Sequence, residues 1–323
     1  MERRVFAAIV ILLGYNTALA ALPDAVANAM ARHRLDPSHL SVAVRPVDGG
    51  PALAAHNAAV LRNPASTIKV LTTFAALHQL GPTYTWETHA LVAGGLRNGQ
   101  LAGPLILRGE GDPFLVTEQL YKLLLQVRVR GVREIQGGLI LDDSYFRLPE
   151  GDPGAFDGNA HRPYNVLPGA LVVNFQTTRL TLVPQDGGRR GLILADPPAS
   201  NLTVVDNLTW TEGHCRGKRL HVTIDHEDRG GRVVVGGRYP RACGEDEIYR
   251  SVATASAMTF GVVDALWQHL GGELRGGWRR ARTPPNAPPR GPMAAPALAA
   301  HLGGGYKKTH KIIDGPRVQH LGG

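Results

Sequence analysis

The chain has 323 residues, of which 43% are hydrophobic, and a formal net charge of +8 at pH 7. This length is enough for two or three domains with a sizeable core. The arginines are scattered and no stripe of interleaved basic and aromatic residues occurs, which argues against a nucleic-acid-binding protein. The 13 histidines are dispersed without metal-ligand spacing, so we expect no metal and no cofactor.

The N-terminus is typical of an export signal. A charged start, Glu2-Arg3-Arg4, precedes an apolar run from Val5 to Leu13 that is too short to span a bilayer. Ala18-Leu19-Ala20 is a small-x-small cleavage site, so residues 1–20 are predicted to be a signal peptide. The alternative is an uncleaved anchor. We expect a periplasmic protein without a transmembrane segment after cleavage, whose basic charge suits an anionic polymer such as cell wall.

The first mature segment predicts a helix, two strands and a second helix. Residues 23–34 suit a helix, residues 40–47 alternate as a strand does, and residues 52–56 form a second strand after a turn at 48–50. A further helix is expected to begin in Asn63-Pro-Ala-Ser-Thr-Ile-Lys69.

This second helix carries the clearest chemical signal. Ser66 and Lys69 are three residues apart, which places both side chains on one helical face, with Ser66 at the positive end of the helix dipole. A neighbouring amine can take the serine proton if partial burial lowers its pKa, so the pair indicates a nucleophile and its base. The alternative is an ordinary helix start with a solvated lysine. The apolar residues that follow predict a buried helix: Val70, Leu71, Phe74, Ala75 and Leu77.

The remaining chain alternates between strand and helix patterns. Residues 85–107 contain short alternating segments, residues 116–130 suit a helix with Leu120, Leu123, Leu124 and Val127 on one face, and residues 137–146 read as a strand running into a loop. Residues 171–240 are rich in strands, predicted at 178–183, 202–205, 219–224 and 232–235. A helix is expected over 248–270 and an extended proline-rich linker over 283–296.

The two cysteines, Cys215 and Cys243, both lie near this strand-rich block. An even number in an exported chain predicts a disulfide, worth on the order of 3 kcal/mol. Two unrelated thiols are the alternative.

Together these residues resemble the low-molecular-mass class C penicillin-binding proteins, the D-alanyl-D-alanine carboxypeptidase/endopeptidase family. The resemblance runs from about Ala21 to Leu274 and rests on four segments: Asn63–Lys69, Arg108-Gly-Glu-Gly-Asp-Pro113, Leu141-Asp-Asp-Ser-Tyr-Phe146 and Tyr164–Gly169. It implies an α+β fold, an incomplete penicillin-binding (DD-peptidase/β-lactamase-like) catalytic domain with inserted β-rich domains. The implied division is a catalytic part at 21–87, an insertion at 88–246, a second catalytic part at 247–302, and an aberrant tail at 303–323.

The same resemblance assigns site residues. It implies that Ser66 is the acylated nucleophile, that Lys69 is its base, and that Asp142 and Phe146 contact the diamino-acid side chain of the peptide. A strand-end turn capped by Asp142 is the alternative for that segment. The implied partners are peptidoglycan peptides and β-lactams, and no oligomeric state follows.

The chain departs from the family after the insertion. The family needs a Ser-x-Asn triplet and a Lys-Thr-Gly triplet, and neither occurs in these 323 residues. Lys308-Thr309-His310 has a histidine where glycine lets substrate lie against the strand. A reading-frame change near Ile313 is one explanation. We therefore expect an impaired serine-type D-Ala-D-Ala carboxypeptidase, with a non-catalytic exported peptidoglycan-binding protein as the alternative. A class A β-lactamase would not carry so long an insertion.

Overall fold

The computed structural model describes residues 22–185, 190–283 and 310–314. Its contacts divide the chain into two compact units, Met1–Pro82 and Thr83–Gly323. Within the described ranges, no helix has both the length and the apolar character needed to cross a membrane. The predicted signal peptide and most of the proline-rich linker lie outside the described residues.

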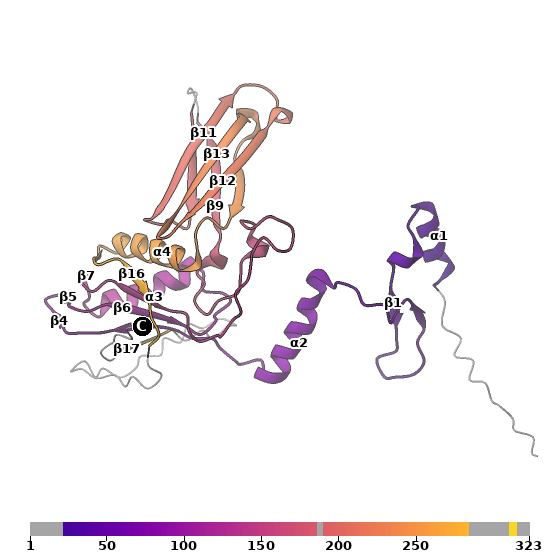
Figure 1. Ribbon diagram of the computed structural model, residues 1–323, viewed down its shortest axis with the longest axis horizontal. Helices are drawn as coiled ribbons and strands as arrows, with labels where there is room; N and C mark the ends of the chain where they lie inside the picture. The colour runs from indigo at the N-terminus through magenta and orange to yellow at the C-terminus, as the bar shows by residue number, and fades with distance from the viewer. Residues whose placement is uncertain (1–21, 186–189, 284–309, 315–323) are drawn as a thin grey trace, which may run out of the picture. The chain divides into compact units, whose positions relative to one another are not determined.

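The first unit follows the predicted order of helix, two strands and helix (Figure 1). Its strands pair antiparallel, with Ala43 opposite Ala55. The last helix ends where Gly81 adopts a positive φ of 78°, a conformation that costs glycine little. The elements are α1 (Asp24–Arg32), β1 (Val42–Val44), β2 (Ala54–His56), the 3-10 turn Ala65–Thr67 and α2 (Ile68–Leu80).

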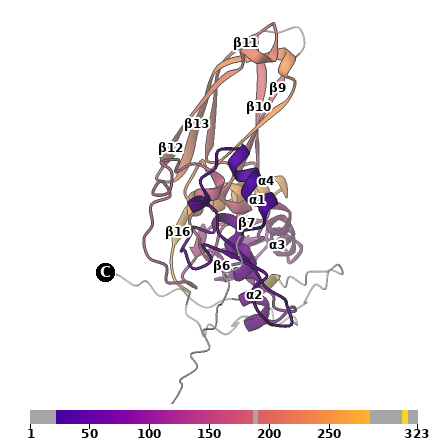
Figure 2. The same ribbon diagram turned by 90° about the vertical axis from the view of Figure 1, so that its right-hand side faces the viewer.

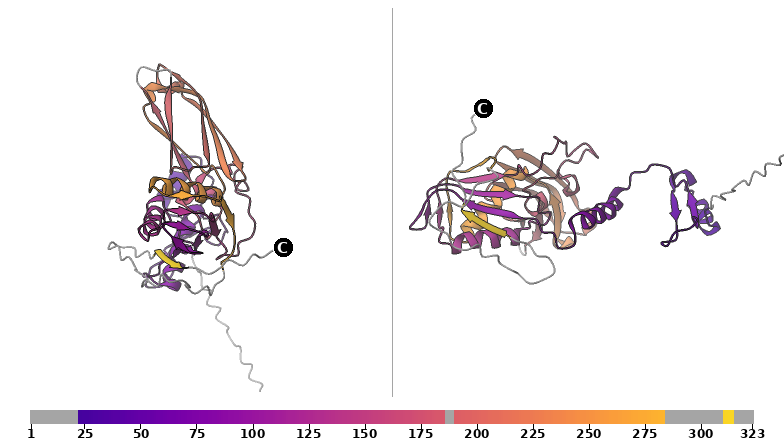
Figure 3. Two further views of the ribbon diagram at one scale, coloured as in Figure 1. Left: turned by 90° about the vertical axis from the view of Figure 1, so that its left-hand side faces the viewer. Right: turned by 90° about the horizontal axis from the view of Figure 1, so that it is seen from below.

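The second unit begins with a mixed layer of two sheets and two helices. A five-stranded sheet has the order β16-β8-β6-β3-β17, and a four-stranded sheet has the order β15-β7-β5-β4. Figure 3 shows the five-stranded sheet from below, with β17 at its edge. The elements are β3 (Thr88–Val92), β4 (Leu96–Arg97), β5 (Gln100–Leu101), β6 (Leu105–Gly109), α3 (Thr117–Val129), β7 (Glu134–Ile135), β8 (Leu139–Asp142), α4 (Ala255–His269), β15 (Glu273–Leu274), β16 (Trp278–Arg280) and β17 (His310–Asp314).

One apolar core joins the sheets of this layer to its helices. Leu107 and Leu141 of the sheet, Leu120 and Leu124 of α3, and Trp267 of α4 are all almost fully buried in it. The predicted apolar face of α3 is confirmed, because Leu120, Leu123, Leu124 and Val127 are all buried. Periodicity predicted this face correctly because a helix places residues at intervals of three and four on one side.

The strand-rich block forms a sandwich of two three-stranded sheets (Figure 2). Leu180 and Leu182 of one sheet face Val233 and Val235 of the other in a second core. One sheet has the order β10-β9-β14 and the other β11-β13-β12. The strands are β9 (Thr178–Pro184), β10 (Gly191–Asp196), β11 (Leu202–Thr211), β12 (Arg219–Glu227), β13 (Gly230–Pro240) and β14 (Asp246–Arg250).

Polar contacts join the sandwich to α4. The side-chain amide of Asn201 donates to Ala257 O at 2.9 Å and to Arg229 O at 2.6 Å. Gly261 is needed at this junction, because an added Cβ would lie 1.8 Å from Asn201 Oδ1. The amide of Gln176 donates to Ala253 O at 2.8 Å. The helix and the sandwich are therefore joined by side-chain amides that donate to backbone carbonyls, partly buried at Ala253 and Ala257.

Three sequence expectations need correction. The helix expected from residue 248 begins at Ala255, because residues 248–250 belong to β14 and Thr254 caps the helix by accepting from Ala257 N. The strands β10 and β14 were missed. Residues 310–314 of the tail form a strand, which pairs in parallel with β3 and satisfies backbone groups at its edge.

The predicted domain limits stay a prediction. The unit boundary after Pro82 lies close to the expected boundary after residue 87. The described part of the segment 247–302 lies in the second unit, where Val262 and Trp267 of α4 share the core with β6 and β8.

Replacing Leu124 with alanine should lower the free energy of unfolding by about 2–5 kcal/mol, because it opens a cavity in the core. Leu125→Ala is the matched control on the same helix, since Leu125 is 39% exposed. The control should cost less than about 0.5 kcal/mol. Urea unfolding followed by circular dichroism measures both, and equal costs would contradict this core.

The predicted disulfide between Cys215 and Cys243 is present, with Cα atoms 4.7 Å apart. It closes a separation of 28 residues. The double variant Cys215→Ser/Cys243→Ser should lose on the order of 3 kcal/mol of stability. A reducing agent should lower the melting temperature of the wild type and leave that of the double variant unchanged. A wild type indifferent to reductant would contradict the expectation.

Candidate active site

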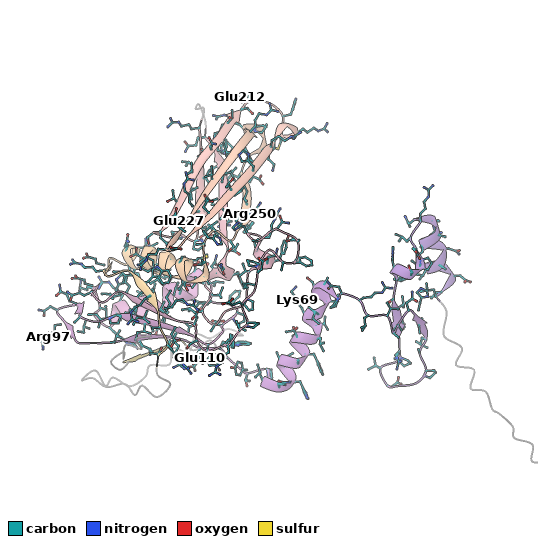
Figure 4. The ribbon with its side chains drawn as sticks, in the orientation of Figure 1. Lys69, Arg97, Glu110, Glu212, Glu227 and Arg250 are labelled. Carbon is teal, nitrogen blue, oxygen red and sulfur yellow. A yellow bond between two sulfur atoms is a disulfide. The ribbon has the colours of Figure 1, made fainter. Side chains whose placement is uncertain are left out.

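The predicted nucleophile and base are in contact. Lys69 Nζ donates to Ser66 Oγ at 2.9 Å, from the first turn of α2 to the 3-10 turn before it. Figure 4 labels Lys69 at this end of the helix. Asn63 Oδ1 accepts from Ala65 N at 2.9 Å, and Ala65 takes a positive φ of 45°. This turn presents the serine oxygen at the positive end of the helix dipole.

The burial of α2 was predicted wrongly for the described residues. The apolar stripe exists, but Val70 is 75% exposed and Phe74 is 64% exposed. No residue of this helix is buried by the part of the chain that the structure describes. Periodicity defines which residues share a face, whereas burial requires a second surface to pack against that face.

Asp142 is the last residue of β8, and both oxygens of its carboxylate accept hydrogen bonds. Its Oδ1 accepts from Ser144 N at 3.1 Å and from Ser144 Oγ at 2.6 Å. Its Oδ2 accepts from Thr283 N at 2.7 Å and from the Thr283 hydroxyl. Burial opposes ionisation, but these hydrogen bonds outweigh it and hold the pKa of Asp142 below its usual value.

This geometry favours the alternative role of Asp142. The bonds to Ser144 form the strand-end turn that sequence analysis offered as the alternative. An ionised carboxylate has about four acceptor positions, and all are occupied here. Binding the ammonium group of a peptide would require Thr283 to leave, so the substrate-binding role of Asp142 stays a prediction.

Phe146 lies where three motif segments meet. Its ring packs against Gly111, where an added Cβ would lie 2.4 Å from Phe146 Cζ. Gly111 N donates to Ala170 O at 2.9 Å, which joins Arg108–Pro113 to the residues that follow Tyr164–Gly169. The second unit thus brings together three of the four segments that carry the family resemblance. Ser66 and Lys69 belong to the first unit.

One cluster of possible ligands was not predicted from the sequence. Within the described residues, Glu87, His89 and Glu110 each offer one ligand atom, and these atoms lie within 4.8 Å of one another. The histidine is buried, with 6% of its surface exposed. The available signal was the Glu-x-His spacing of residues 87–89, which places both side chains on one face of a strand. Glu110 directly follows β6, and only the pairing of β3 with β6 brings it beside the other two residues.

Comparison with known proteins identifies a matching family. Residues 22–295 match the family described as "D-Ala-D-Ala carboxypeptidase 3 (S13) family". A D-alanyl-D-alanine carboxypeptidase DacB from Haemophilus influenzae is 37% identical over 109 residues, which are 34% of this chain and 23% of that protein. A D-alanyl-D-alanine carboxypeptidase from Actinomadura sp. is 37% identical over 102 residues, 29% of this chain and 19% of that protein.

Solved structures show a similar fold. The crystal structure of penicillin binding protein 4 (dacB) from Haemophilus influenzae has a TM-score of 0.61 and 25% identity, covering 76% of this chain and 53% of that one. The same protein complexed with a novel β-lactam has a TM-score of 0.55 and 24% identity, covering 76% and 51%. This chain therefore spans about half the length of the relative whose structure it matches.

Asp142→Asn should destabilise the protein by about 1–3 kcal/mol at pH 7, because an amide cannot accept from both Ser144 and Thr283. The lowered pKa of Asp142 means that its contribution is complete above about pH 5 and is lost as the pH falls below about 4. Melting temperatures of the two proteins should therefore converge in acid. Asp143→Asn is the control, because Asp143 forms a partly exposed pair with Arg280. A difference in melting temperature between the wild type and Asp142→Asn that does not change with pH would contradict this role of the ionised Asp142 carboxylate.

Proposed function

Because this chain belongs to the D-Ala-D-Ala carboxypeptidase 3 (S13) family, we propose that it carries the acylation site of an exported serine-type D-Ala-D-Ala carboxypeptidase/endopeptidase. The substrates are peptidoglycan stem peptides, and β-lactams react at the same serine. The contact between Lys69 Nζ and Ser66 Oγ, 2.9 Å long, carries the proposal.

The chemistry uses Ser66 as nucleophile and Lys69 as base. Ser66 Oγ bonds to the carbonyl carbon of the penultimate D-alanine while its proton passes to the lone pair of the Lys69 amine, which acts in its unprotonated form. The peptide C–N bond then breaks and the leaving amine takes a proton. Water hydrolyses the resulting ester and frees the serine. The dipole of α2 favours the negative charge that develops near Ser66.

Turnover is impaired in this 323-residue chain. Serine activation is one part of the reaction, and the leaving amine, the substrate carboxylate and the oxyanion each need a partner. In the family, Ser-x-Asn and Lys-Thr-Gly serve the leaving amine and the carboxylate, and the strand bearing Lys-Thr-Gly also provides an oxyanion donor. Neither triplet occurs in these 323 residues. Loss of one oxyanion donor alone typically costs about 100-fold or more in rate.

The second candidate is a non-catalytic exported peptidoglycan-binding protein, and the missing triplets are the observation that favours it. The two candidates differ at Ser66. Covalent capture of a β-lactam at that residue requires a nucleophile, whereas simple binding of peptidoglycan does not.

Fluorescent penicillin should label this chain little or not at all. A chain translated from the alternative reading frame near Ile313 should be labelled, and Ser66→Ala should abolish that label. Thr67→Ala is the neighbouring control and should keep it. Mass spectrometry of the proteolysed, labelled chain should identify Ser66 as the residue that carries the penicilloyl ester. Stoichiometric labelling of the 323-residue chain would overturn the proposed impairment, and labelling that survives Ser66→Ala would overturn the proposed nucleophile.

A further inference from the structure

The cluster of Glu87, His89 and Glu110 places two carboxylates directly opposite each other. Strands β3 and β6 are antiparallel, with Thr88 opposite Gly109. One residue further along, Glu87 therefore stands opposite Glu110, and Glu110 N donates to Glu87 O at 3.1 Å. Like charges at directly opposed strand positions are destabilising, so this arrangement calls for a neutralising group between them.

His89 faces both carboxylates through a single nitrogen. Its Nε2 lies 3.1 Å from Glu110 Oε1 and 3.4 Å from Glu87 Oε2. One ring nitrogen carries at most one hydrogen, so His89 can make a well-directed bond to only one of these oxygens. The other carboxylate then remains close to a ring nitrogen without receiving a proton from it.

The neighbouring charges leave this region negative. Arg108 Nη2 lies 2.8 Å from Glu110 Oε1 and supplies a positive charge to that carboxylate. Burial raises the pKa of the Tyr84 hydroxyl, and Tyr145, Glu110 and Glu87 raise it further. With a neutral histidine, two glutamates outweigh one arginine.

We propose that Glu87, His89 and Glu110 form a binding site for a divalent transition-metal cation of the Zn²⁺ type. Zinc binds histidine nitrogen and carboxylate oxygen at about 2.0–2.2 Å in a tetrahedron, which places neighbouring ligand atoms roughly 3.4 Å apart. Two of the three separations, 3.1 and 3.4 Å from His89 Nε2, agree with that requirement, and all three ligand atoms lie within 4.8 Å of one another. The Glu87 and Glu110 side chains are 36% and 21% exposed, so water has access to the fourth position.

Two features make this an exchangeable site. Arg108 competes with the cation for Glu110 Oε1. Among the described residues, His89 Nδ1 has no hydrogen-bond partner, whereas tight zinc sites usually hold that nitrogen with a second group. A bound cation joins the start of the second unit to the loop after β6, which carries the Arg108–Pro113 motif.

Zn²⁺ titration of the full chain, followed by calorimetry and by thermal melting, tests the site. The wild type should bind Zn²⁺ with a rise in melting temperature. Glu87→Gln and Glu110→Gln should each weaken this binding by more than about 10-fold, since loss of even an outer partner typically costs 10- to 100-fold. Arg108→Gln should bind Zn²⁺ more tightly than the wild type, because it removes the competitor for Glu110.

Glu227→Gln is the matched control, because Glu227 is an exposed glutamate at the end of β12 (Figure 4). It should leave Zn²⁺ binding unchanged, so binding to histidines elsewhere in the chain appears as a background common to all variants. Co²⁺ bound to the wild type should give a visible absorption spectrum typical of coordination by nitrogen and oxygen. Glu110→Gln should abolish this spectrum. Equal Zn²⁺ binding by Glu110→Gln and Glu227→Gln would overturn the proposal, and so would an Arg108→Gln variant with unchanged affinity.

Discussion

The second unit depends on the apolar contact between α3 and α4, which lie far apart in the chain. Leu120, Leu123 and Leu124 of α3 share one core with Val262 and Trp267 of α4. Between the two helices the chain builds β7, β8 and the whole sandwich. The contact between α3 and α4 is therefore non-local. Closing the long loop between the two helices costs conformational entropy, which the burial of apolar surface in the core offsets. The bonds from Asn201 to α4 then fix the sandwich to this core.

A polar row crosses three strands of the five-stranded sheet, on the face opposite this core. Register pairs His89 of β3 with Arg108 of β6, and Arg108 with Asp142 of β8. Each end of the row gathers a residue from outside these strands: Glu87 beside His89, and Thr283 beside Asp142. Ionic and hydrogen-bonded groups thus organise the strand ends where the motif segments meet. At the Asp142 end, the cost of desolvating the carboxylate is offset by hydrogen bonds from Ser144 and Thr283.

Many elements could be predicted from the sequence because their signals are local. The helix at 116–130 was predicted from its apolar face and lies at Thr117–Val129. The contact of Ser66 with Lys69 follows from helical spacing alone, because residues three apart share a face. The pairing of Cys215 with Cys243 was predicted from their even number and the expected oxidising compartment. The short strands β10 and β14 were missed because their pairing with β9 is what makes them strands.

The sequence by itself determined the family, the contact of Ser66 with Lys69 and the location of most helices, since each depends on residues close together in the chain. Only the tertiary structure decided which residues distant in the chain become neighbours. In the folded chain the carboxylate of Asp142 accepts hydrogen bonds from Ser144 and from Thr283, and Thr283 is 141 residues away in the sequence. The tertiary structure also placed Glu110 opposite Glu87 and beside His89, so the third member of this cluster cannot be found from linear spacing. Burial and cross-strand neighbours are properties of the folded chain, and a one-dimensional pattern contains neither.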